Sequence, residues 1–349
     1  MFKNEELIKY FFPEEGERKP INDTKFVTTS RCKKLFFQDF FNTPIPCDCY
    51  DAVVSGAGKE EDKIDTFYSS SLQSLLFFCN VSKKHPLIYR EVKYTKVVFE
   101  WKNPVISFPS SIDVVLIGEK ETGEKKTKRV IMFIESKLYE VIRDSDTSGT
   151  HEIGSSYFKQ KNGYTQRLGL NEKDYHDLGI VKDDVNSKKQ SLIKPIDKNS
   201  YIENGEKKNG FVYSYGIKQM LSHIIGILRF KDEPKARYPR EGEYFKNYVK
   251  ENNYDIFFLT LINGMPGFND TDADAQKKLR DFKNHYDSVI DLLTKEHSDK
   301  LPGIELLPCT TYQAFYKEVK KEGYKLSETI EKYYHLEEKS DLDEKSSHA

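Results

Sequence analysis

Two apolar, strand-like segments constrain this chain most, because each carries a carboxylate near one end. They are Ile112-Asp113-Val114-Val115-Leu116-Ile117 and Val130-Ile131-Met132-Phe133-Ile134-Glu135-Ser136-Lys137. Alternate side chains of a strand share a face, so Glu135 and Lys137 point the same way and Ser136 points away. If the polar residues 118–129 close a hairpin, the start of the first strand meets the end of the second. The sequence therefore predicts that Asp113 lies opposite Glu135 and Lys137.

Two carboxylates that converge at the end of a sheet suit a hard divalent cation. Mg²⁺ prefers oxygen ligands and keeps several waters. We expect Asp113 and Glu135 to bind Mg²⁺ or Mn²⁺, and the ammonium of Lys137 to orient or help deprotonate an attacking water. The alternative is a salt-bridge cluster in a chain that is rich in lysine. Both acids border apolar segments, where a charged group needs a compensating partner, and this favours a site.

The composition is that of a folded protein without a charge bias. Its 349 residues are 37% hydrophobic, which is enough for a sizeable core. The 55 Lys and Arg nearly cancel the 56 Asp and Glu, so any affinity for nucleic acid must come from a local patch. Apolar runs such as residues 256–262 are far shorter than the roughly 20 residues of a membrane span. Because the first residues carry acids where a signal peptide would be basic, we expect a cytoplasmic protein without a membrane anchor.

The cysteines do not predict a disulfide framework. There are five, an odd number, at positions 32, 47, 49, 79 and 309. Cys47 and Cys49, with Cys32 and Cys79 on either side, could form a zinc or iron–sulfur site, but one C-x-C pair is a weak signal. Cys79 fits the pattern of a small core residue in a helix. Free thiols are the simplest expectation.

Periodicity and composition divide the chain into three parts. We expect a helical N-terminal arm over residues 1–54, one domain over 55–310, and C-terminal helices with a polar tail over 311–349. The expected elements of the domain are a helix at 69–80, strands at 94–101, 112–117 and 130–137, a helix at 213–229, a strand at 254–263, a helix at 274–296 and a short strand at 304–307. A polar region at about 143–210 predicts an inserted loop or small subdomain.

The order of these central elements is helix, strand, strand, strand, helix, strand. With Asp113 in the second strand and Glu135 and Lys137 closing the third, it resembles the PD-(D/E)XK nuclease superfamily, and more narrowly its bacterial restriction-endonuclease-like branch. The resemblance covers residues 55–265. It implies an α/β fold with an αβββαβ core, in which helices flank a mixed central sheet. The N-terminal and C-terminal helices are additions to that core.

The resemblance also implies roles for individual residues. Asp113 and Glu135 match the metal ligands, and Lys137 matches the residue that positions the attacking water. In this branch the helix after the third strand carries a glutamine that holds the lysine or the substrate phosphate. Here that residue is Gln219, and His223, four positions later on the same helical face, is a supporting neighbour.

One part of the family pattern is missing. Many members carry a further acidic ligand on the first core helix, whereas residues 69–80 contain no acid. Glu60, just before this helix, is the nearest substitute for the metal site. Glu100, at the end of the first strand, is another candidate for a supporting role, although a structural role suits it better.

Contacts with DNA are expected from two basic groups. The first lies beside the site, and the second lies in the polar insertion: they are Lys126, Lys128 and Arg129, and Lys159, Lys161 and Arg167. A solvated surface explains such groups equally well, because isolated basic runs carry little specificity.

The sequence thus favours a metal-dependent nuclease that hydrolyses phosphodiester bonds of DNA. The first alternative is a nuclease-like protein that binds nucleic acid or a protein partner without cleaving it. The second is an interaction protein in which the charged residues only pair with one another. A homodimer would suit a cut through both strands of a duplex, but the sequence does not require one.

Overall fold

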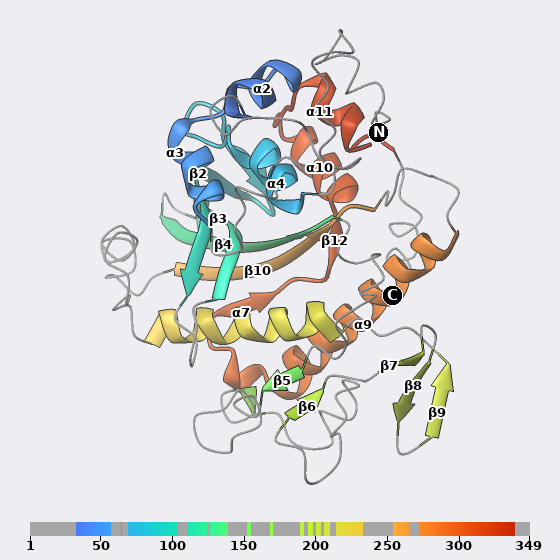
Figure 1. The fold of residues 1–349 in the computed structure, drawn as a ribbon. Coiled ribbons are helices and arrows are strands. Elements are labelled where there is room, and N and C mark those ends of the chain that lie inside the picture. The colour runs from blue at the N-terminus through green and yellow to red at the C-terminus, as the bar shows by residue number, and fades with distance from the viewer. Residues whose placement is uncertain are drawn as a thin grey trace, which may run out of the picture.

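The central feature of the fold is a mixed seven-stranded sheet with helices on both faces (Figure 1). The computed structural model describes residues 33–56, 64, 69–103, 110–123, 126–138, 152–154, 168–169, 189–191, 195–197, 200–203, 206–209, 214–232, 254–264 and 273–338. The strand order is β1-β2-β3-β4-β10-β11, and β12 also pairs with β10. The bounds are β1 Leu87–Tyr89, β2 Val92–Asn103, β3 Ser110–Glu121, β4 Thr127–Lys137, β10 Tyr254–Ile262, β11 Ile304–Leu306 and β12 Thr310–Thr311. The predicted α/β class with a mixed sheet is confirmed.

The sheet changes from antiparallel to parallel pairing at β4. Strands β1 to β4 form an antiparallel meander. Strand β10 then lies parallel to β4, from Tyr254 opposite Arg129 to Ile262 opposite Lys137. Strands β11 and β12 are in turn parallel to β10. A parallel neighbour needs a long crossover connection, and helix α7 lies in the connection between β4 and β10.

Strands β3 and β4 form the predicted hairpin, with Val114 opposite Ile134. The two strands are longer than the apolar segments indicated, because pairing continues through most of the polar segment up to Glu121 and Thr127. Glu119 pairs across the ladder with Arg129, and opposite charges in such a position stabilise a sheet. The reversal itself contains Gly123, whose φ of +75° is a left-handed conformation that glycine adopts without strain.

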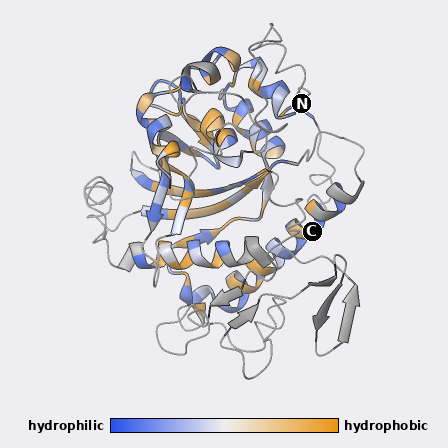
Figure 2. Ribbon diagram, viewed as in Figure 1, coloured by the Kyte–Doolittle hydropathy of each residue, from blue (hydrophilic) through white to orange (hydrophobic). Residues whose placement is uncertain are grey.

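The helices form a layer on each face of the sheet (Figure 1). One layer contains α7 Ser214–Asp232 and α9 Ala273–Glu296, followed by the short 3-10 helix η4 Ser298–Lys300. The other contains α2 Lys33–Phe40, α3 Cys47–Val54, α4 Ser70–Phe78, α10 Tyr312–Lys321 and α11 Glu328–Tyr333. The hydrophobic residues of sheet and helices form one core cluster on each side (Figure 2).

The alternation of side chains along β4 separates these two cores. Ile131 and Phe133 belong to the core beneath α7, whereas Met132 and Ile134 belong to the core beneath α4. Continued to the end of the strand, the same alternation places Glu135 with the first pair. The face assignment that the sequence predicts for the end of β4 is therefore confirmed.

Helix α4 begins where the sequence predicts. The Ser69 hydroxyl accepts a hydrogen bond from the Leu72 backbone N–H at 3.0 Å, which is a side-chain N-cap. The helix is fixed to the end of β4, because the Ser136 hydroxyl donates to the Ser70 carbonyl at 3.4 Å and contacts the Tyr312 hydroxyl at 2.8 Å. Helices α4 and α10 thus both support the strand end that carries the charged residues.

The polar insertion contributes two small sheets. One pairs β5 Glu152–Gly154 with β6 Lys189–Ser191, and the other contains β7 Pro195–Asp197, β8 Ser200–Glu203 and β9 Glu206–Asn209. Among the described residues, neither sheet pairs with the central one. The described cysteines Cys47, Cys49, Cys79 and Cys309 are free, and Cys79 is buried as predicted. No described helix combines the length and the apolar character that a bilayer-spanning helix needs.

Candidate active site

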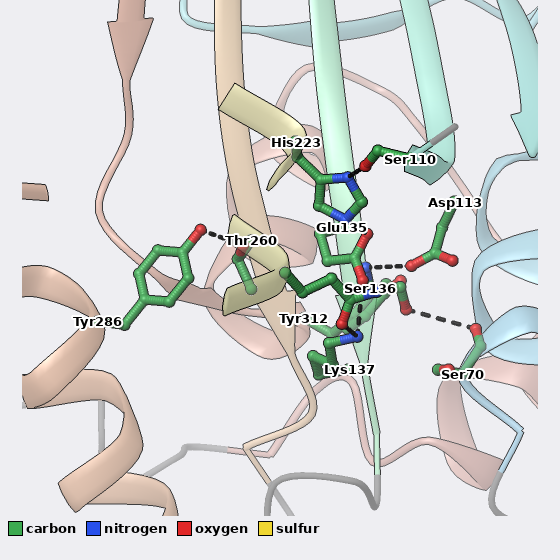
Figure 3. A network of polar contacts seen from close by, with 11 residues as sticks. Ser70, Ser110, Asp113, Glu135, Ser136, Lys137, His223, Thr260, Tyr286 and Tyr312 are labelled. Carbon is green, nitrogen blue, oxygen red and sulfur yellow. Dashed lines mark hydrogen bonds and ion pairs between the residues drawn. The ribbon is translucent and has the colours of Figure 1, made fainter. Parts of the chain in front are cut away.

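Glu135 lies buried at the end of β4 between two basic side chains (Figure 3). The Lys137 ammonium Nζ is 2.6 Å from its Oε1, and His223 Nε2 is 3.0 Å from its Oε2. The same ammonium donates to the amide oxygen of Gln219 at 2.8 Å. Gln219 and His223 come from the predicted helix, α7, and their spacing of four positions brings both to one site. The structure therefore brings together these four predicted residues.

The charge of Glu135 is strongly stabilised by its neighbours. Burial alone would raise the pKa of a carboxyl group, because a charged form loses its hydration. The Lys137 ammonium and then His223 outweigh this effect and lower the pKa of Glu135 from 4.5 to about 2. Glu135 is consequently an anion at neutral pH although its side chain is nearly inaccessible.

Asp113 stands beside this group with the opposite electrostatics. Its Oδ2 accepts a hydrogen bond from the Ser136 backbone N–H at 2.7 Å, across the end of the β3–β4 hairpin. Burial and the negative charge of Glu135 raise the pKa of Asp113 well above its ordinary value of 3.8, while Lys137 opposes the shift. The ionised form of Asp113 is thus destabilised, and a cation between the two acids would relieve this.

Asp113→Asn is expected to raise the melting temperature of the metal-free protein at neutral pH. A carboxyl group whose pKa is raised by folding stabilises the fold below its unfolded pKa and loses this contribution as pH rises through the folded pKa. Asparagine removes the charge and can still accept from Ser136. Thermal unfolding is measured without metal at pH 7 and near pH 4. The melting temperature of Asp113→Asn should exceed that of the wild-type protein at pH 7, and the difference should disappear toward the acid pH.

A matched control for this prediction is Asp287→Asn. Asp287 also accepts a backbone N–H, that of Cys309 at 2.7 Å, but it is paired with Lys283 at 2.6 Å. Loss of its charge should therefore lower the melting temperature at pH 7. Equal destabilisation by the two substitutions would contradict the electrostatic assignment of Asp113.

Glu100 is a third acid near Asp113. In β2 it stands between Phe99, opposite Val114, and Trp101, opposite Ile112, so its register position faces Asp113. Its charge contributes to the raised pKa of Asp113. Glu100 has a φ of +50°, a left-handed conformation that costs a non-glycine residue about 1–2 kcal/mol. Such strain concentrates at functional sites.

A glycine makes room for the Glu100 carboxyl group. A Cβ at Gly56 would lie 2.8 Å from both Cδ and Oε2 of Glu100. A larger residue at this position would displace the carboxyl group. The structure therefore places Glu100 close to the site, whereas Glu60, the other acid that the sequence suggests, lies outside the described residues.

The donor atoms fit a cation that retains much of its hydration. Glu135 is an anion whose two oxygens face Lys137 and His223, and burial and the Glu135 charge destabilise the ionised form of Asp113. Within the described part of the chain, no three His, Cys, Asp or Glu side chains are grouped so that they could hold a metal ion. Mg²⁺ is commonly bound by one or two carboxylates together with waters and substrate phosphates. The two acids suit that mode of binding.

No protein-family model matches this chain, and neither a curated protein nor a solved structure matches it. The assignment of a function therefore depends on the geometry and chemistry of the site.

The basic residues Lys126, Lys128 and Arg129 do not lie beside the site, and this part of the prediction is wrong. Lys128 and Arg129 are at the start of β4, and Lys126 immediately precedes the strand. A strand rises about 3.3 Å per residue, so Arg129 is about 26 Å from Lys137 along the strand. Lys128 is paired with Asp255 at 2.6 Å. The second predicted group, Lys159, Lys161 and Arg167, lies outside the described residues.

Sequence reasoning missed two buried polar residues. Ser110, the first residue of β3, contacts His223 Nδ1 through its hydroxyl (Figure 3). Gln73 of α4 is fully buried, and neither atom of its amide has a hydrogen-bond partner within the described protein. Gln73 lies one helical turn after Ser70, whose carbonyl contacts β4. A lone amide within an apolar helix is a signal that could have found Gln73, but no spacing rule singles out Ser110.

Proposed function

We propose that this chain is a metal-dependent nuclease that hydrolyses phosphodiester bonds of DNA on a restriction-endonuclease-like αβββαβ core. The observation that carries the proposal is the buried group at the end of β4. There Lys137 is held between Glu135 and Gln219 and the ionised form of Asp113 is destabilised. A buried lysine and two adjacent carboxyl groups of opposite pKa behaviour are characteristic of catalytic sites.

The order of the structural elements supports the same proposal. Helix α4, strands β2, β3 and β4, helix α7 and strand β10 occur along the chain in the order of the αβββαβ arrangement, with the short strand β1 added between α4 and β2 and the small sheets β5–β9 inserted before α7. Asp113 lies near the start of β3, Glu135 and Lys137 close β4, and Gln219 lies on α7. These are the positions at which the resemblance expects functional residues.

The residues of the site divide the work of hydrolysis. Asp113 and Glu135 would hold the cation. A bound Mg²⁺ would polarise the scissile phosphate and offset the negative charge that develops on its oxygens. In the reaction, water forms a new P–O bond, the bond to the leaving sugar oxygen breaks, and this oxygen takes up a proton. Contacts with Glu135 and Gln219 hold the Lys137 ammonium in one position. From this position the ammonium would orient the attacking water and stabilise the phosphate oxygens.

One observation favours the alternative, a nuclease-like protein that binds nucleic acid or a partner without cleaving it. Glu135 already has two basic neighbours, Lys137 and His223, and these compete with a cation for its oxygens. In that case the cluster would be a buried ion-pair network. A cleavage assay distinguishes the two functions.

The test of the proposal uses the purified full chain with supercoiled and linear duplex DNA, single-stranded DNA and RNA, each with Mg²⁺, Mn²⁺ or EDTA. We expect DNA cleavage with either metal and none with EDTA. Lys283→Met, which removes a lysine paired with Asp287 on α9, should retain cleavage. No cleavage of any substrate, with no metal-induced rise in melting temperature, would contradict the nuclease function and support the alternative.

A further inference from the structure

We propose that Ser110 and His223 are a positioning pair that holds Glu135 in the orientation in which a divalent cation can bind it. This role rests on the proposed nuclease function and adds to it a requirement for two residues outside the predicted ligand set. His223 acts on Glu135 directly, and Ser110 acts through the His223 ring. Neither residue is itself assigned as a ligand or as a group that touches the substrate.

The two oxygens of Glu135 have different neighbours. Oε1 accepts from Lys137, whereas Oε2 faces His223 Nε2 at 3.0 Å (Figure 3). A carboxylate that is contacted on both oxygens from different sides cannot rotate about its last bond without losing one contact. His223 comes from α7 and Lys137 from β4, so the carboxylate is fixed between two elements of the fold.

Ser110 fixes the imidazole ring in turn. Its hydroxyl contacts His223 Nδ1, and both residues are buried, with exposed fractions of 8% and 1%. If the hydroxyl donates to Nδ1, the neutral ring carries its hydrogen on Nε2; if the ring is protonated, both nitrogens carry hydrogen. In either state an N–H group faces Glu135. A flip of the ring would lose the contacts at both nitrogens.

The contact between His223 and Glu135 leaves room for a cation. Both side chains are buried, and His223 Nε2 is 3.0 Å from Glu135 Oε2. A carboxylate oxygen has two lone pairs, and one N–H group occupies only one of them. The arrangement therefore limits where Oε2 can go while leaving a lone pair available to a cation.

The remaining surroundings of the ring restrict its motion. The Phe258 ring of β10 lies beside it, with centroids 6.1 Å apart and planes inclined at 50°. Ser110 begins the strand that also carries Asp113, and Glu135 closes the neighbouring strand. The pair therefore links the strand of one proposed ligand to the carboxylate of the other, so displacement of either strand end would alter both ligands together.

The test compares His223→Leu, His223→Gln, Ser110→Ala and the double variant Ser110→Ala/His223→Leu. Two quantities are measured for each: the Mg²⁺ concentration for half-maximal DNA cleavage, and the Mn²⁺ affinity without DNA. Loss of a residue that orients a ligand typically weakens metal binding about 10- to 100-fold. We expect an effect of this size for His223→Leu and a substantial recovery in His223→Gln, whose amide N–H can reach Oε2. Ser110→Ala should weaken binding alone but add nothing in the His223→Leu background.

Tyr324→Phe is the matched structural control. It breaks another buried contact, the 2.5 Å hydrogen bond that the Tyr324 hydroxyl donates to the Phe77 carbonyl, in the core on the other face of the sheet. We expect it to lower stability and leave the metal dependence unchanged. If His223→Leu does the same, or if the effects of Ser110→Ala and His223→Leu add fully, the positioning role is overturned.

The experiment also separates the two levels of the proposal. If the wild-type protein cleaves DNA and all variants show the same metal dependence as the wild type, the nuclease function stands and the positioning role is overturned. A wild-type protein that neither binds Mn²⁺ nor cleaves DNA overturns the nuclease function, and the positioning role falls with it.

Discussion

Lys137→Met is expected to lower the rate of metal-dependent DNA cleavage about 100- to 1000-fold, which is the typical loss when one preorganised electrostatic donor is removed. Methionine has a similar length and volume but carries no charge. Without the ammonium, nothing at this position holds the attacking water or offsets charge on the phosphate oxygens. Glu135 retains His223 as a partner at 3.0 Å, so the fold should persist. The rates are measured in single turnover at saturating Mg²⁺.

Two comparisons make this expectation specific. Lys283→Met removes a lysine that is also partly buried and paired, and should cleave DNA at the wild-type rate. Lys137→Arg keeps a positive charge but not the compact geometry of an ammonium held between Glu135 and Gln219, so it should restore little activity. A Lys137→Met protein that is folded and fully active would exclude a catalytic role for the lysine.

Glu135→Ala is expected to have the second large effect, on both stability and activity. Removal of one partner of a buried ion pair typically costs about 3–5 kcal/mol, because the other charge stays buried without compensation. Here the remaining charge is that of Lys137, whose side chain is 8% exposed. Asp113, which already interacts with Lys137, can offset part of this cost. Cleavage and the response of the melting temperature to Mg²⁺ should both be lost.

Urea unfolding, followed by the fluorescence of the buried Trp101, measures the cost directly. The control is Glu305→Ala, which breaks an exposed ion pair with Arg90 and should change the free energy of unfolding by no more than about 1 kcal/mol. If Glu135→Ala changes the free energy of unfolding by no more than this control does and cleavage persists, Glu135 is neither a buried partner of Lys137 nor a metal ligand.

The part of the site that the sequence predicts is the part that follows from periodicity. The period of two along β4 brings Glu135 and Lys137 to one face, and the helical spacing of Gln219 and His223 brings both to the same point. Asp113 follows from the hairpin, since an antiparallel ladder joins the start of one strand to the end of the other. Each of these neighbour relations follows from local spacing or from one strand pairing, so each can be predicted from a single sequence.

The rest depends on contacts that periodicity does not encode. Ser110 contacts His223 only because α7 packs over the start of β3, and Glu100, itself in a left-handed conformation, occupies the β2 position opposite Asp113. The basic run at the start of β4 lies far from the site, because the turn of a hairpin is at the opposite end from its open strand ends. The polar composition of residues 118–129 predicts a loop, whereas cross-strand pairs such as Glu119 with Arg129 extend the ladder into this segment.

The cation site is tested most directly by a titration of Mn²⁺ into the metal-free protein without nucleic acid, followed by the electron paramagnetic resonance signal of the free ion. We expect the wild-type protein to bind Mn²⁺, Mg²⁺ to compete with it, and Asp113→Asn to weaken binding while the folded state remains intact. A wild-type protein that does not bind Mn²⁺, or one that binds it equally well with asparagine at position 113, would contradict a cation site between Asp113 and Glu135.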